Sequence, residues 1–78
     1  MPSIMWSGPY QFLFYSADQG EPPHVHVRRD RRKAKLWLDP VRLQKRSGFG
    51  DAEMQRVERL VRANRERLLE AWDEYFGA

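Results

Sequence analysis

The chain has 78 residues and a formal net charge of +3, which leaves room for one small domain, residues 1–78, and no second one. It has no cysteine, which excludes disulfides and thiolate metal sites and fits a reducing compartment. No apolar run approaches the roughly 18 residues of a membrane span, and the first residues lack the pattern of a signal peptide. We therefore expect a cytoplasmic protein without membrane contact.

Positive charge is concentrated in the middle of the chain. Residues 28–46 hold nine basic and two acidic side chains, a net charge of +7, whereas residues 1–27 and 47–78 each carry −2. Such a patch attracts polyanions or an acidic protein partner. A solvated hairpin end that arginine keeps soluble gives the same pattern, so the charge alone does not decide between these interpretations.

Two strands are predicted in the first third of the chain. Residues 10–16 are rich in aromatic side chains, and Gly and Pro bound them on the N-terminal side. Residues 24–29 alternate between polar and apolar side chains, and two prolines precede them. Since successive side chains of a strand point to opposite faces, His24 and His26 share one face and the valines between and after them share the other.

A third strand and a helix complete the predicted elements. Residues 34–38 alternate as a strand that Pro40 ends, and residues 40–50 form a basic linker. From residue 51 to 76 apolar side chains recur at helical spacing. One long helix is the first expectation, and a break into two helices near Asn64 is the alternative.

The predicted fold is α+β: a three-stranded antiparallel sheet over residues 10–39, packed against one long C-terminal helix over residues 51–76. The sheet face turned away from the helix carries the side chains of His24, His26, Arg28, Lys35, Trp37 and Asp39. An aromatic ring on a bare sheet face is typical of an interface, with a partner or with a second copy of the chain. Of the other tryptophans, Trp72 is predicted in the core and Trp6 as a lid.

The two histidines are the first candidates for chemistry. Two imidazoles on one face can hold a Zn or Fe ion when a carboxylate supplies a third ligand. The carboxylates available for this are Asp39, Asp18 and Glu21. We expect Asp39 to be the third ligand beside His24 and His26. No further histidine supports such a site, so the favoured expectation is no cofactor, with a divalent metal as the alternative.

The same histidines allow two other interpretations. As acid and base at neutral pH, His24 and His26 could cleave RNA while Arg28 or Arg29 holds the scissile phosphate. Alternatively, both rings could hydrogen-bond the Asp39 carboxylate and simply order the sheet.

Binding without chemistry is the favoured interpretation of the central segment. Six basic side chains lie around one predicted hairpin, beside Trp37: Arg28, Arg29, Arg31, Arg32, Lys33 and Lys35. Basic groups for phosphates and flat rings for bases suit RNA or DNA, and an acidic protein would satisfy the same charges.

Four segments together resemble one known family. They are YQFLFYS at residues 10–16, EPPHVHV at 21–27, AKLWLDPVRL at 34–43 and NRERLLEAWDEYF at 64–76. In this combination the chain resembles the small prokaryotic family called domain of unknown function 4160, over nearly its whole length. The resemblance implies a cytoplasmic protein that pairs with a small cognate protein encoded alongside it, in the manner of toxin–antitoxin modules.

The function predicted from the sequence is a toxin–antitoxin-type module that binds nucleic acid or an acidic cognate protein through the basic hairpin. The alternative is a small hydrolytic enzyme, ribonuclease-like or metal-dependent, that uses His24 and His26.

Overall fold

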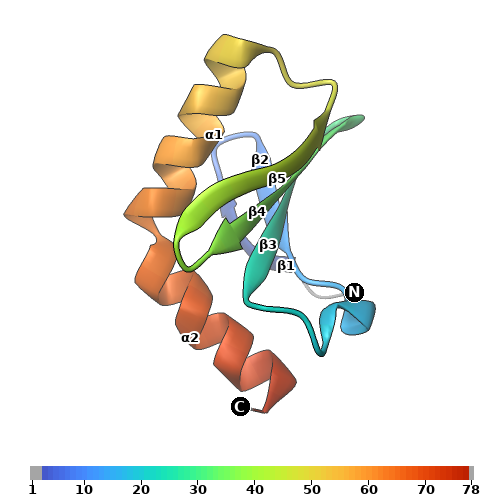
Figure 1. Ribbon diagram of the computed structural model, residues 1–78. Coiled ribbons are helices and arrows are strands. Elements are labelled where there is room, and N and C mark those ends of the chain that lie inside the picture. The colour runs from blue at the N-terminus through green and yellow to red at the C-terminus, as the bar shows by residue number, and fades with distance from the viewer. Residues whose placement is uncertain (1–2, 78) are drawn as a thin grey trace.

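Five antiparallel strands form one sheet in chain order in the computed structural model, which describes residues 3–77 (Figure 1). The strands are β1 (Ser3–Ser7), β2 (Tyr10–Leu13), β3 (His24–Arg29), β4 (Arg32–Leu38) and β5 (Val41–Ser47). One turn of 3-10 helix, η1 (Ser16–Asp18), precedes β3, and two helices follow the sheet, α1 (Asp51–Ala63) and α2 (Arg65–Phe76). The α+β class and the antiparallel sheet are confirmed, but the prediction of three strands and one helix is wrong.

Both edge strands were missed in the prediction, and β5 replaces most of the predicted linker over residues 40–50. In β5 the apolar alternation stops after Leu43, and a bulge follows it. Leu36 pairs with Leu43 whereas Lys35 pairs with Lys45, so Gln44 is the extra residue. An edge strand needs few apolar side chains and commonly carries lysine, which is why this segment resembles a basic linker in the sequence.

The predicted alternative of a helix break near Asn64 is correct. Asn64 has φ −112° and ψ 15°, outside the helical region, and separates α1 from α2. Its side-chain amide donates a hydrogen bond to the carbonyl oxygen of Leu60 at 2.8 Å, so this polar group is satisfied on the apolar side of the helices. The break lets α1 pack against β5 and α2 against β4.

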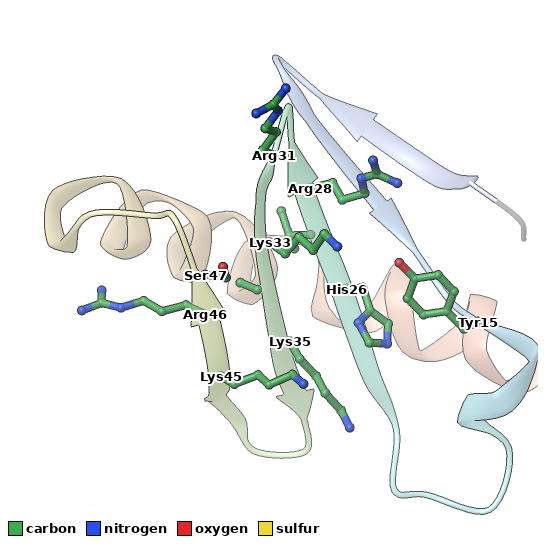
Figure 2. A pocket seen from close by; sticks show the side chains of 11 residues that line it. Tyr15, His26, Arg28, Arg31, Lys33, Lys35, Lys45, Arg46 and Ser47 are labelled. Atoms are coloured by element: carbon green, nitrogen blue, oxygen red, sulfur yellow. The ribbon is translucent and has the colours of Figure 1, made fainter.

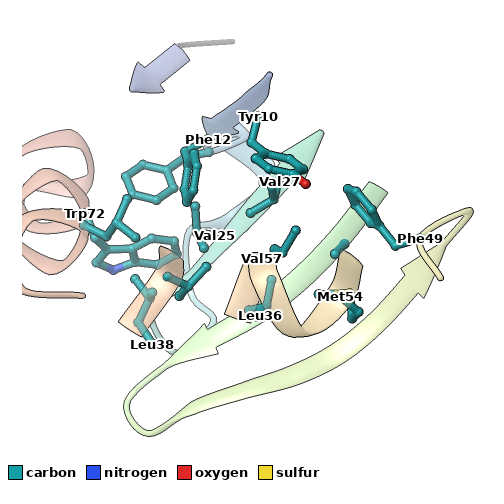
Figure 3. Packing of buried hydrophobic residues seen from close by; sticks show 14 residues of the cluster. Tyr10, Phe12, Val25, Val27, Leu36, Leu38, Phe49, Met54, Val57 and Trp72 are labelled. Carbon is teal, nitrogen blue, oxygen red and sulfur yellow. The ribbon is translucent and has the colours of Figure 1, made fainter. Parts of the chain in front are cut away.

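The core lies between the helices and one face of the sheet (Figure 3). The strands contribute the fully buried Val25, Val27, Leu36 and Leu38, as their alternation predicts. Opposite them lie the buried helix residues Met54, Val57, Val61, Leu68 and Trp72. Because both helices cover this one face, the other face of the sheet is left without a helix (Figure 1). Among the described residues, neither helix is long and apolar enough to cross a membrane.

Candidate functional site

The outer sheet face, defined as the face away from the helices, carries side chains in rows that cross the strands. In an antiparallel sheet, residues directly opposite each other project to the same face. One row crosses all five strands and consists of Trp6, Gln11, Arg28, Lys33 and Ser47. The next row holds Leu13, His26, Lys35 and Lys45, and the third holds His24, Trp37 and Arg42. Leu13 and His24 are fully buried, and the other side chains of these rows, far apart in the sequence, form one polar and aromatic surface.

A hollow of about 510 Å³ lies on this face, and basic side chains dominate its lining (Figure 2). The basic residues around it are Arg28, Arg31, Lys33, Lys35, Lys45 and Arg46. Tyr15 and His26 form one side, with their ring centroids 4.5 Å apart. Among residues 3–77, no carboxylate lines this hollow.

Two of these cations already have a partner. Lys35 pairs with Glu21 at 2.8 Å, and its ammonium also lies 5.0 Å from the centre of the Trp37 ring. Arg46 points away from the hollow in Figure 2 and pairs with Asp51 at 2.6 Å. Within the described part of the chain, the other four cations of the lining have no ion pair.

Asp18 lies against both histidines, and these three residues form the Asp18 cluster, of which His26 borders the hollow. His26 Nε2 donates to the Asp18 carboxylate at 3.1 Å. His24 Nε2 lies 3.1 Å from Asp18 Oδ1 without the direction of a hydrogen bond, while its Nδ1 donates to the carbonyl oxygen of Pro22 at 3.0 Å. The backbone N–H of Tyr15 donates to Asp18 Oδ2 at 2.9 Å and so fixes the carboxylate.

The environment sets the charge of two members of this cluster. Burial alone would raise the pKa of Asp18, but the Tyr15 N–H and both imidazoles outweigh it and bring this pKa below its usual range. Burial lowers the pKa of His26, and the contact with Asp18 offsets this effect only in part. At neutral pH the cluster therefore contains a carboxylate beside the neutral ring of His26.

The comparisons with known proteins identify a family. A family model described as a domain of unknown function, DUF4160, matches residues 10–73. The chain belongs to the DUF4160 family. The matched segment of this DUF4160 protein contains the Asp18 cluster and all residues that line the hollow, whereas β1 with Trp6 lies outside it. No curated protein and no solved structure matches the chain.

The prediction that Asp39 lies beside the histidines is wrong for this DUF4160 protein. Asp39 lies in the turn after β4 with an exposed side chain and pairs with Arg65 of α2 at 2.8 Å. Asp18 takes its place because η1 folds back toward the start of β3. Of the three carboxylates that the sequence offered, Asp18 is the one that lies against both imidazole rings.

The six cations of the predicted binding hairpin separate into two groups. Arg29 and Arg32 project to the helix side and contact Glu53 of α1 at 2.6 and 3.2 Å. The phenol of Tyr10 donates to the same carboxylate at 2.8 Å. These two arginines therefore fasten α1 to the sheet. The other four, Arg28, Arg31, Lys33 and Lys35, line the hollow, and Lys45, which the sequence prediction left in the linker, joins them.

The charge of Glu53 allows a test of whether these contacts hold α1 against the sheet. The Tyr10 hydroxyl and the Arg29 guanidinium hold the pKa of Glu53 below its ordinary value of 4.5. A carboxyl group with a lowered folded-state pKa stabilises the fold above that ordinary value, and the contribution disappears as the pH falls through the folded-state pKa. We expect Glu53→Gln to be less stable than the wild type at neutral pH, and the difference to shrink below pH 4.5.

Urea unfolding at neutral pH and below pH 4.5 measures the difference in stability between Glu53→Gln and the wild type. Glu70→Gln, at an exposed position of α2, is the control and should follow the wild type at every pH. A stability difference for Glu53→Gln that does not change with pH would mean that packing of the side chain, rather than its charge, fastens α1.

Proposed function

We propose that the outer sheet face of this protein binds single-stranded nucleic acid. The observation that carries the proposal is that like charges occupy directly opposite positions on neighbouring strands of the sheet. Arg28 lies directly opposite Lys33, and Lys35 lies directly opposite Lys45. Like charges opposite each other destabilise a sheet. Glu21 already offsets the charge of Lys35, and a polyanion on this face would offset the remaining repulsion.

Aromatic rings favour a nucleic acid over other polyanions. Trp6 is 62% exposed at the end of the row that contains Arg28 and Lys33. Tyr15 borders the hollow, and Trp37 lies two residues along β4 from Lys35. Unpaired bases stack on such rings while cations contact the phosphates, and a sheet surface offers both to a single strand.

The other predicted functions receive less support from the geometry. His24 is fully buried, so it cannot touch a substrate, and of the two histidines only His26 borders the hollow. A ribonuclease that uses the two rings as acid and base needs both within reach of the phosphate. An acidic cognate protein suits the charges, and a protein interface can also cover the rings, so the titration with an acidic polypeptide described below distinguishes the two partners. The toxin–antitoxin setting implied by the family resemblance stays a prediction.

Fluorescence anisotropy with a labelled RNA oligonucleotide of about ten nucleotides tests the proposal. With four unpaired cations around the hollow, the logarithm of the binding constant should fall against the logarithm of salt concentration with a slope of about −3, as for a single strand. Single-stranded DNA should bind similarly, and duplexes more weakly. Absence of binding at low salt would refute the proposal, and tighter binding of an acidic polypeptide would favour the protein partner instead.

A further inference from the structure

One buried polar atom in the Asp18 cluster has no role in the fold. His24 is fully buried, and among residues 3–77 its Nε2 has no hydrogen-bond partner, although a carboxylate oxygen lies 3.1 Å away. A carbonyl oxygen can only accept, so the contact with Pro22 places a proton on Nδ1 of His24. In the neutral ring Nε2 then carries a lone pair at 3.1 Å from an oxygen of the Asp18 carboxylate. Two electron-rich atoms this close in a buried site repel each other unless a cation binds to both.

We propose that Asp18, His24 and His26 bind a divalent transition-metal ion, with Zn²⁺ the preferred one. The side chains offer two imidazole nitrogens and one carboxylate oxygen, a donor set that suits zinc. The proposal concerns the Asp18 cluster alone and does not depend on nucleic-acid binding.

The distances suit such an ion. Zinc bonds of about 2.0–2.2 Å at a tetrahedral angle place neighbouring donor atoms about 3.3 Å apart. From Asp18 Oδ1, His24 Nε2 lies at 3.1 Å and His26 Nε2 at 3.3 Å, and one donor atom from each of the three residues lies within 4.8 Å of the others. If the nitrogen–nitrogen separation must shorten on binding, His26 has room to turn, because its side chain keeps 19% exposure.

The contacts around the cluster resemble those that orient metal ligands. A metal-binding histidine commonly donates its other N–H to a backbone carbonyl, as His24 does to Pro22. The Tyr15 N–H holds the Asp18 carboxylate in the same way.

Three protein ligands leave one position of a tetrahedral ion for water or a phosphate oxygen. His26 borders the hollow, so the cluster adjoins a surface that solutes reach. A site that only ordered the fold by hydrogen bonds would instead direct an N–H from each ring at the carboxylate. His26 does so, but His24 does not.

Titration calorimetry with Zn²⁺ on tag-free protein, after dialysis against a chelator, tests the proposal. We expect one ion per chain in the wild type. Asp18→Asn and His26→Gln each remove a ligand, so each should weaken zinc binding by more than the roughly 10- to 100-fold loss typical of outer contacts. Asp39→Asn is the matched control, because it removes the carboxylate that the sequence favoured, and it should bind zinc as the wild type does.

A second measurement needs no substitution and remains decisive if a variant does not fold. The chain has two histidines, so nitrogen NMR of the wild type resolves both imidazoles. We expect zinc to shift Nε2 of both rings while Nδ1 of His24 keeps its proton. Zinc that leaves these nitrogens unchanged, or that binds Asp18→Asn as tightly as the wild type, would overturn the proposal, as would a wild type that binds none.

Discussion

Replacing Arg28, Lys33 and Lys45 together by glutamine is expected to abolish most binding of single-stranded RNA. These cations line the hollow without an ion pair among the described residues. Three phosphate contacts on a single strand account for about 2 units of the salt slope, which corresponds to a loss of roughly 100- to 1,000-fold in affinity near 50 mM salt. Anisotropy titrations at several salt concentrations measure the affinity and the slope together.

The same substitution should not weaken the fold. Each of the two like-charge pairs on the outer face loses at least one charge, so the repulsion between neighbouring strands decreases. We therefore expect the triple variant to be at least as stable as the wild type. A variant that binds weakly because it unfolds would show the opposite, and urea unfolding distinguishes the two cases.

A triple substitution on the helices is the matched control. Arg56, Arg59 and Arg67 are exposed residues of α1 and α2, and their replacement by glutamine changes the net charge by the same amount. If binding depends on the outer sheet face, this control keeps most of its affinity. An equal loss in both triple variants would mean that overall charge attracts the RNA and that the hollow is not its site.

The sequence predicts the centre of the fold well because its signals there are local. In β3 and β4 apolar side chains recur at every second position except at the hairpin end, so the alternation alone assigns the two faces and places His24, His26 and Trp37 on the outer one. The helical stripe over residues 51–76 is equally periodic. Only Asn64 interrupts it, and the prediction kept a break there as its alternative.

The edges of the sheet were harder to predict because their pairing depends on the neighbouring strands. β1 is joined to β2 by Gly8 and Pro9, and Gly8 has a φ of 56°. A glycine at the first position of a two-residue turn is a hairpin signal that could have revealed β1. Trp6, predicted as a lid, instead lies exposed on β1.

The candidate site was predicted only in part for a similar reason. The spacing of the histidines in one strand follows from the sequence, but the position of Asp18 depends on how residues 16–23 fold back toward β3. Lys45 reaches the outer face through the bulge at Gln44, which no local pattern marks. Arg29 and Arg32 were assigned to the binding surface by charge alone, whereas strand alternation places them on the helix side with Glu53.

The two tryptophans at opposite ends of the chain should respond to truncation in opposite ways. Trp72 is 6% exposed, and its ring lies 5.2 Å from that of Phe14 and 5.1 Å from that of His24. Trp72→Ala should cost about 3–5 kcal/mol of unfolding free energy. A domain of 78 residues has roughly 4–12 kcal/mol in total, so much of its stability would disappear.

Trp6→Ala is the matched substitution at a position that is 62% exposed. It should change the unfolding free energy by less than about 0.5 kcal/mol, yet remove a stacking contact worth about 1–3 kcal/mol in RNA binding. Urea unfolding and anisotropy on both variants separate these effects. A large stability loss in Trp6→Ala would show that the ring supports β1, and unchanged RNA affinity would remove it from the binding surface. Because Trp72 also packs on His24, its loss should loosen the Asp18 cluster together with the core.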